Sequence, residues 1–366
     1  MALPVVHTLT ECADFQNTVA PFIDQLRPFP QVFWESIANS AALNQLYVDT
    51  NPLVTSTAFA LALAPIFLLV SEINRNYSQV DRFWSILPTV FNFHYAVYAR
   101  AAGIDTKRVD AVLAVSMLWS VRLTYNYYRK GGYNVGTEDY RWATVKATIG
   151  APLFFVMNVV FIAFMQCILL LAITTPTYIL LLTGRLASNS SSSQGWTILD
   201  PVPYVFMLGL IGISFIADQQ QWDFHKAKAE YQKTAKVPTD YSRAELDRGF
   251  LSSGLWAYSR HPNFTAEQGV WVVLYIWSCI ASQTLYNWTG VGAFSYLCLF
   301  QASTWLTELL SSRKYPEYKV YQRYVGKFLP IPGMSAKFPV SASKPVNGSV
   351  TATSDATKAR ARYDLR

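Results

Sequence analysis

The most informative segment of this sequence reads Gly254-Leu-Trp-Ala-Tyr-Ser-Arg-His-Pro-Asn-Phe-Thr-Ala-Glu267, and a long apolar run follows it directly. Proline has a fixed φ and no backbone N–H, so Pro262 suits the first turn of a helix better than its middle. We therefore expect Arg260 and His261 in the loop before a helix. Asn263 and Glu267 then fall in its first turns. Because a helix N-terminus attracts anions, the motif predicts a clamp for a phosphate or a carboxylate.

The same motif has a simpler interpretation as a turn at the membrane surface. In that turn Arg260 would meet lipid headgroups and Glu267 would neutralise it. A carboxylate one turn inside a hydrophobic helix is costly, however, and such groups usually face a partner or a polar cavity. The sequence therefore favours a binding or catalytic site at this helix, with the surface turn as the alternative.

The composition identifies the class of protein. Apolar residues make up 52% of the 366 residues and charged residues only 14%, against roughly a quarter in a typical soluble domain. The aromatic fraction of 15% suits the belts of Tyr and Trp at membrane interfaces. These values predict an integral membrane protein.

Several kinds of site are excluded by the pattern of residues. The four cysteines show no CxxC spacing and read as small apolar residues, so neither a disulfide framework nor a metal site is expected. The four histidines include no His-x-x-x-His pair, and no Walker or Gly-x-Gly-x-x-Gly loop occurs. We expect no metal, no soluble dinucleotide-binding domain and no nucleic-acid partner.

The apolar runs predict an all-α, polytopic bundle of about seven transmembrane helices. The fourth run contains Pro176, where we expect a tilt or a break. The second and third runs carry polar residues that should face protein or water instead of lipid. The predicted spans are 54–70, 83–98, 111–128, 152–182, 202–217, 269–283 and 291–310.

The distribution of basic residues predicts the orientation. Residues 1–53 contain one Lys or Arg, whereas residues 311–366 contain eleven. Since cytosolic loops carry the excess of Lys and Arg, we expect 1–53 to be a non-cytosolic segment and the C-terminus to be cytosolic. Between them, 54–338 forms the membrane domain, and 339–366 reads as a disordered basic tail.

N-glycosylation tests this orientation. The triplets that begin at Asn189 and Asn287 fall in loops predicted to lie on the non-cytosolic side, so we expect a glycan at one of them. The measurement is a glycosidase-sensitive mass shift that disappears in Asn189→Gln or Asn287→Gln. A glycan at Asn347 would reverse the predicted orientation.

The motif at 254–267 resembles the "LWxYSRHPNYxGE" signature of the steroid 5-alpha-reductase-like C-terminal domain proteins, and most closely their DUF1295 branch. The resemblance covers roughly residues 50–332. Its supporting matches are Val80-Asp-Arg-Phe-Trp-Ser-Ile-Leu-Pro88, Arg122 through Asp139-Tyr-Arg-Trp142, Asp223-Phe-His-Lys226, and Lys314-Tyr-Pro-Glu-Tyr-Lys-Val-Tyr-Gln322 with Phe328-Leu-Pro330.

This resemblance implies a membrane reductase that holds NADPH in its helix bundle and reduces a carbon–carbon double bond of a lipid-like substrate, most often in the endoplasmic reticulum. The positions implied for the cofactor are Asn126, Asp139, Arg141, Asp223, Tyr258, His261 and Asn263, with Lys226, Arg248 and Arg260 as further cations for its phosphates. Glu267 is implied as a catalytic residue, and Tyr77 is a second candidate, alongside Glu72 and Tyr95.

The chain departs from the family signature at Phe264-Thr265-Ala266, where relatives have Tyr-Phe-Gly. The carboxylate–tyrosine pair that polarises a steroid carbonyl also has no clear counterpart, so steroid specificity is not expected.

Two other functions remain open at this point. Membrane methyltransferases that use S-adenosylmethionine on prenylated or lipid substrates share the Arg-His-Pro turn and a Tyr-rich terminal helix. They tend to have paired glutamates at the end of the seventh span, where this chain has Thr307-Glu308-Leu309. A non-enzymatic membrane protein that keeps the fold is the third possibility.

Overall fold

The computed structural model describes residues 2–189 and 195–330. Over these residues the secondary structure is helical, which confirms the predicted all-α class, and extended pairing is limited to an isolated bridge between Ser259 and Gly326. The chain divides into two compact units. The first comprises Met1–Gly209 with Gln268–Leu299, and the second comprises Leu210–Glu267 with Phe300–Arg366.

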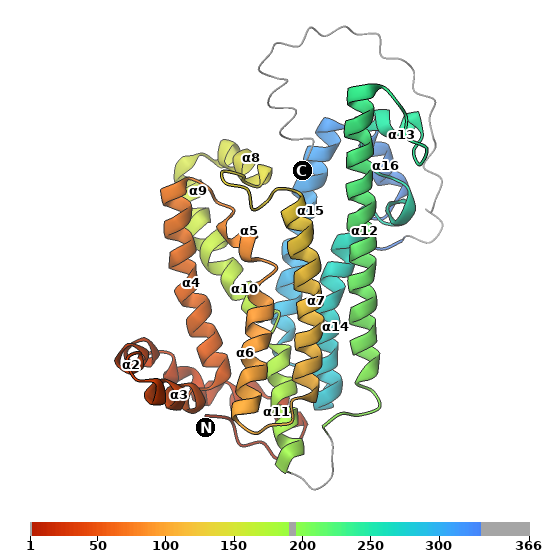
Figure 1. The fold of residues 1–366 in the computed structure, drawn as a ribbon. Helices are drawn as coiled ribbons and strands as arrows, with labels where there is room; N and C mark the ends of the chain where they lie inside the picture. Colours follow the sequence, from red (N-terminus) through yellow and green to blue (C-terminus); the bar gives the residue numbers. More distant parts are fainter. Residues whose placement is uncertain (1, 190–194, 331–366) are drawn as a thin grey trace. The chain divides into compact units, whose positions relative to one another are not determined.

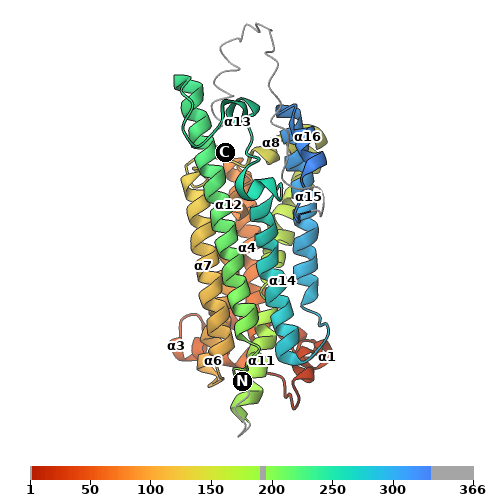
Figure 2. The ribbon, with the colours of Figure 1, turned by 90° about the vertical axis from the view of Figure 1, so that its right-hand side faces the viewer.

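The first unit holds a set of long helices, with shorter ones at either end. Helix α6 packs against both α4 and α7, and it lies between them in the view of Figure 1; Figure 2 shows the same helices from the side. The elements of this unit are η1 (Thr10–Ala13), α1 (Phe15–Thr18), η2 (Ala20–Gln25), α2 (Phe29–Ser36), α3 (Ser40–Asp49), α4 (Pro52–Asn74), α5 (Gln79–Phe83), α6 (Leu87–Ala101), α7 (Lys107–Arg129), α8 (Tyr140–Ile149), α9 (Ala151–Met157), the π-helix η3 (Asn158–Met165), α10 (Gln166–Ala172) and α11 (Pro176–Asn189).

Three later helices contribute residues to both units, and three short ones belong to the second unit alone. The former are α12 (Pro201–Thr234), α14 (Pro262–Ser282) and α15 (Gly290–Lys314). The latter are α13 (Arg243–Arg248), η4 (Gly254–Ala257) and α16 (Tyr318–Tyr324).

Four helical segments are long and apolar enough to cross a membrane: Pro52–Asn74, Ala151–Ser188, Pro201–Thr234 and Pro262–Ser282. The protein is thus a membrane protein by this criterion, but the predicted count of seven spans is not confirmed. Helix α6 has only 15 residues, which at about 1.5 Å per residue falls short of a bilayer core of about 30 Å. Helix α7 carries Arg108, Asp110, Arg122 and Asn126.

The predicted helix boundaries at two prolines are confirmed. Helix α14 begins at Pro262, directly after Arg260 and His261, as the missing proline N–H requires. The predicted fourth span is interrupted at Pro176, where α10 ends and α11 starts. Between these helices the hydroxyls of Thr174 and Thr175 donate to the carbonyls of Leu171 and Ala172, which satisfies part of the free backbone.

A buried ion pair fixes the interior of the first unit. The guanidinium of Arg108 donates to both carboxylate oxygens of Asp200, from Nε at 2.8 Å and from Nη2 at 3.0 Å. The same carboxylate accepts from Trp277 Nε1 at 2.7 Å and from the hydroxyl of Thr197 at 2.9 Å. Arg108 is 4% exposed and Asp200 is 1% exposed, so α7, the segment before α12, and α14 are joined by charges that water does not reach.

Some predicted features lie outside the described residues, namely the tail 339–366 and Asn347. In the first unit, the polar segments that follow α4 and α7 contact each other, so they lie at one end of its helices.

Candidate functional site

Two segments that carry the sequence resemblance bind each other in the first unit. Arg82 donates from Nη2 to the carbonyl of Thr137 at 2.7 Å, and the hydroxyl of Ser78 accepts from the backbone N–H of Asp139 at 2.9 Å. The loop between α7 and α8 can fold this tightly because Gly131 adopts φ 76° and because a Cβ at Gly132 would overlap the Tyr127 ring. The structure therefore brings these two motifs, which are distant in the sequence, together in one site.

Asp139 and Arg141 form a half-buried ion pair at the start of α8. Asp139 caps the helix by accepting from the Arg141 backbone N–H, and its carboxylate accepts from Arg141 Nε at 2.9 Å and Nη2 at 2.8 Å. Burial opposes the charge on Arg141, but the Asp139 carboxylate outweighs it and raises the pKa of Arg141 above its ordinary value. Arg141 therefore keeps its charge.

Asp81 is buried beside this pair. Its carboxylate accepts from Trp142 Nε1 at 3.0 Å. Burial raises the pKa of Asp81, and the nearby Asp139 carboxylate raises it further. A carboxyl group with a raised pKa beside an ion pair is typical of functional sites, and structural networks of charges raise pKa values in the same way.

The third predicted cofactor residue of this unit, Asn126, is buried near the end of α7. Its amide oxygen accepts from Arg129 Nε at 3.0 Å, so part of its hydrogen-bonding capacity is used within its own helix.

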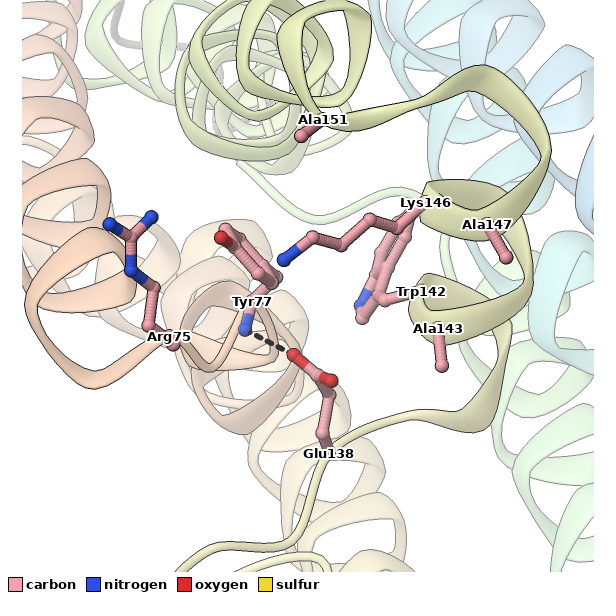
Figure 3. A pocket seen from close by; sticks show the side chains of 8 residues that line it. All are labelled: Arg75, Tyr77, Glu138, Trp142, Ala143, Lys146, Ala147 and Ala151. Atoms are coloured by element: carbon pink, nitrogen blue, oxygen red, sulfur yellow. Dashed lines mark hydrogen bonds between the residues drawn. The ribbon is translucent and has the colours of Figure 1, made fainter.

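Tyr77 lines a cavity of about 450 Å³ beside these residues (Figure 3). Its backbone N–H donates to Glu138 Oε1 at 2.6 Å, and its ring packs edge-on against Phe154. The ammonium of Lys146 lies 5.1 Å from the centre of the Tyr77 ring. The cavity is lined by Arg75, Tyr77, Glu138, Trp142, Ala143, Lys146, Ala147 and Ala151.

In the second unit, Arg260 is held by Glu308 of α15. The guanidinium donates to the two carboxylate oxygens, from Nε at 2.7 Å and from Nη2 at 3.1 Å. Its remaining Nη1 donates to the carbonyls of Gln322 and Val325. Since nearly all the N–H donors are used and Arg260 is buried, this arginine acts as a cross-link inside the unit.

His261 belongs to the same cluster. Its Nε2 lies 2.9 Å from Glu308 Oε1, and Gln322 donates its amide to Glu308 Oε2 at 2.9 Å. Burial lowers the pKa of His261 even though Glu308 acts to raise it. A neutral imidazole with its proton on Nε2 satisfies this geometry, so His261 also serves to hold Glu308.

The motif at 254–267 is fixed along its length by the segment after α16. The Arg260 backbone N–H donates to Gly326 O at 2.9 Å, the Ser259 hydroxyl donates to Lys327 O, and the Thr265 hydroxyl donates to Phe328 O at 2.7 Å. These contacts explain why the motif forms a rigid turn before α14.

A second cavity, of about 620 Å³, lies beside this motif within the second unit. Two predicted cofactor residues, Arg248 and Tyr258, line it together with Ser252, Ser253 and Gly254. Arg248 donates from Nη1 to Ser252 Oγ at 2.7 Å, and burial lowers its pKa. Gly254 has φ 63°, and a side chain there would collide with Gln220, so the wall of the cavity requires glycine.

The other predicted residues of this unit are placed differently. Asn263 donates its amide to Asp218 Oδ1 at 3.1 Å, and Glu267 is buried one turn further along α14. Asp223 and Lys226 are exposed on α12, where Asp223 accepts from Gln219 at 2.9 Å. Tyr258 is 52% exposed at the rim of the cavity.

Sequence reasoning noted Glu308 but not its partner, and it did not single out Lys146 or Asp200. Glu308 is the partner of Arg260, Lys146 faces Tyr77, and Asp200 holds Arg108. An acidic residue in an apolar run, such as Glu308, signals a buried partner. Lys146 and Asp200 stand in polar segments, where the sequence gives no comparable signal.

Comparisons with known proteins agree with the extent of these motifs. The family model described as "Protein of unknown function (DUF1295)" matches residues 67–326. An uncharacterized protein of Schizosaccharomyces pombe is 38% identical over 330 residues, which cover 90% of this chain and 93% of the relative. No solved structure matches.

Proposed function

Because this chain belongs to the DUF1295 family, we propose that it is a membrane-embedded reductase that uses NADPH to reduce a carbon–carbon double bond of a lipid-like substrate. The proposal draws on the likeness of residues 254–267 to the signature of the steroid 5-alpha-reductase-like proteins. We place the activity in the endoplasmic reticulum membrane, with a cytosolic C-terminus.

The observation that carries this proposal is the cavity beside the motif. It combines a guanidinium, two serine hydroxyls and a tyrosine, from Arg248, Ser252, Ser253 and Tyr258. Such a set of donors fits the phosphate and ribose groups of an anionic nucleotide. A cavity of about 620 Å³ falls in the range of small-molecule sites, which is roughly 300–1,000 Å³.

The predicted residues then take different roles in binding. Arg248 and Tyr258 would contact the nucleotide, while Arg260 and His261 hold the motif in shape through Glu308. Asn126, Asp139 and Arg141 of the first unit are cofactor contacts only as the sequence resemblance implies them. Arg141 keeps 27% of its side chain exposed, so it can reach a ligand while Asp139 orients it.

When bound, NADPH would supply a hydride. The chain would supply position and charge: Glu267, buried in the second turn of α14, is proposed to orient the ligand or hold a proton on its carboxyl group. Tyr77 remains a second proposed proton donor, through its hydroxyl.

Arg248→Ala is expected to weaken NADPH binding by about 10- to 150-fold, because it removes a charge-assisted contact worth roughly 1.5–3 kcal/mol. Calorimetric titration of the purified protein in mild detergent measures the effect. The matched control is Arg243→Ala on the same helix, whose side chain is 78% exposed and which should bind as the wild type does.

The titration also separates the alternatives. Equal affinity of wild type and Arg248→Ala would remove this cavity from the cofactor site. Binding of S-adenosylmethionine in place of NADPH would instead support a methyltransferase. A folded wild type that binds neither compound would leave the non-enzymatic alternative.

A further inference from the structure

The cavity beside Tyr77 lies where two candidate membrane spans end. Helix α4 ends at Asn74, directly before Arg75, and the span 151–188 begins at Ala151, which also lines the cavity. The remaining wall of the cavity is formed by α8 and by Glu138, the residue before the helix cap Asp139. Residues at the ends of spans lie at the level of lipid headgroups. The cavity therefore opens at the membrane surface and not in its apolar core.

Two hydrogen-bond donors in this cavity have no acceptor among the described residues. The Lys146 ammonium contacts only rings, at 5.1 Å from the centre of Tyr77 and 5.6 Å from that of Phe154. The Tyr77 hydroxyl likewise has no hydrogen-bond partner in the part of the chain that the structure describes, although Tyr77 is only 4% exposed. In the view of Figure 3 this hydroxyl lies between the Lys146 ammonium and the Arg75 guanidinium.

The acidic groups nearby are already used by other donors. Glu138 Oε1 accepts from the Tyr77 backbone N–H at 2.6 Å. Glu72 accepts from Asn158 at 2.9 Å through one oxygen and from Arg75 at 2.9 Å through the other. Arg75 nevertheless keeps 73% of its side chain exposed, so it can turn towards a second anion. An ammonium, a phenol and a guanidinium around one cavity call for a ligand that only accepts hydrogen bonds.

We propose that this cavity binds the phosphate of an anionic phospholipid headgroup, with Lys146 and Tyr77 as its donors and Arg75 at its rim. Phosphate oxygens accept from several donors at once, and two cations add electrostatic attraction. The acyl chains would then run beside the apolar ends of α4 and α9. The Lys146 ammonium, held over two aromatic rings, keeps its charge in place for the ligand. The proposal assigns the Tyr77 hydroxyl to the lipid phosphate, so Glu267 is then the remaining candidate for the proton of the proposed reaction.

Native mass spectrometry of the purified protein tests this proposal. Wild type is expected to retain dioleoylphosphatidylglycerol in preference to dioleoylphosphatidylcholine. Lys146→Gln should lower this preference about fivefold, which corresponds to about 1 kcal/mol for one basic residue near a lipid surface. Tyr77→Phe should lower it as well. Lys146→Arg keeps the charge and the ring contacts, and should retain the preference.

The matched control is Lys236→Gln, which neutralises an exposed lysine elsewhere and should leave retention unchanged. Equal preference in wild type and Lys146→Gln, with Lys146→Arg folded and also equal, would overturn the proposal. Inorganic phosphate distinguishes the source of the ligand. If it binds as tightly as the lipid and displaces it, the cavity belongs to a soluble phosphate compound and the lipid assignment fails.

Discussion

Arg260→Ala is expected to destabilise the protein by about 3–5 kcal/mol, even with no ligand present. The substitution leaves Glu308 as a buried carboxylate that has lost both guanidinium contacts, with only His261 and Gln322 remaining. It also frees the carbonyls of Gln322 and Val325, which Arg260 satisfies. Thermal unfolding of the purified protein in mild detergent measures this loss as a lower Tm.

Two further variants separate the loss of the pair from the loss of a ligand contact. Arg260→Met combined with Glu308→Leu removes both charges and should recover much of the stability, because a buried ion pair can be replaced by apolar residues of similar volume at little cost. Arg323→Ala, an exposed arginine on α16, should keep the wild-type Tm. An unchanged Tm for Arg260→Ala with weaker NADPH binding would return Arg260 to the role of phosphate ligand.

Asp200→Ala is expected to destabilise the protein by a similar amount, about 3–5 kcal/mol, because it breaks the buried ion pair of the first unit. It leaves the Arg108 guanidinium without a counter-charge at a position where the residue is only 4% exposed. It also removes the acceptor of the Trp277 N–H. Arg108 would keep only its hydrogen bond to Thr183 at 3.2 Å. We expect poor recovery of folded protein and a lower Tm.

The control for this experiment is Asp240→Ala, which removes an exposed aspartate and should have no measurable effect. Asp200→Asn is an informative intermediate because it keeps the shape and one acceptor oxygen while it removes the charge. If Asp200→Ala unfolded at the wild-type temperature, the network around Arg108 would not contribute to stability.

The features that sequence predicted correctly are those set by local chemistry. Pro262 starts α14 because proline lacks an N–H, and Pro176 interrupts the long apolar run for the same reason. The all-α class follows from apolar runs too long for strands. The number of spans was harder to predict, because α6 is too short and the polar residues of α7 make its apolar face narrow.

The partners of the buried charged residues could not be predicted from the sequence. Arg260 was expected to meet a ligand, yet it meets Glu308, which is 48 residues further along the chain. Arg108 and Asp200 are 92 residues apart. Local patterns reveal that a buried charge needs a counter-charge but give no means to choose it, since the choice depends on how helices pack. Arg248 and Tyr258 share a cavity, whereas Asp223 and Lys226 are exposed on another face.

The bridge between Ser259 and Gly326 makes the Arg-His-Pro turn depend on a segment much later in the chain. The family match ends at residue 326, the same residue that accepts the Arg260 backbone N–H. A gene fragment that stopped before this point would encode the Arg-His-Pro turn without the strand-like segment that holds it. A chain that ended at Gly326 would still lack the carbonyls of Lys327 and Phe328, which accept from Ser259 and Thr265, so this turn requires the chain as far as residue 328.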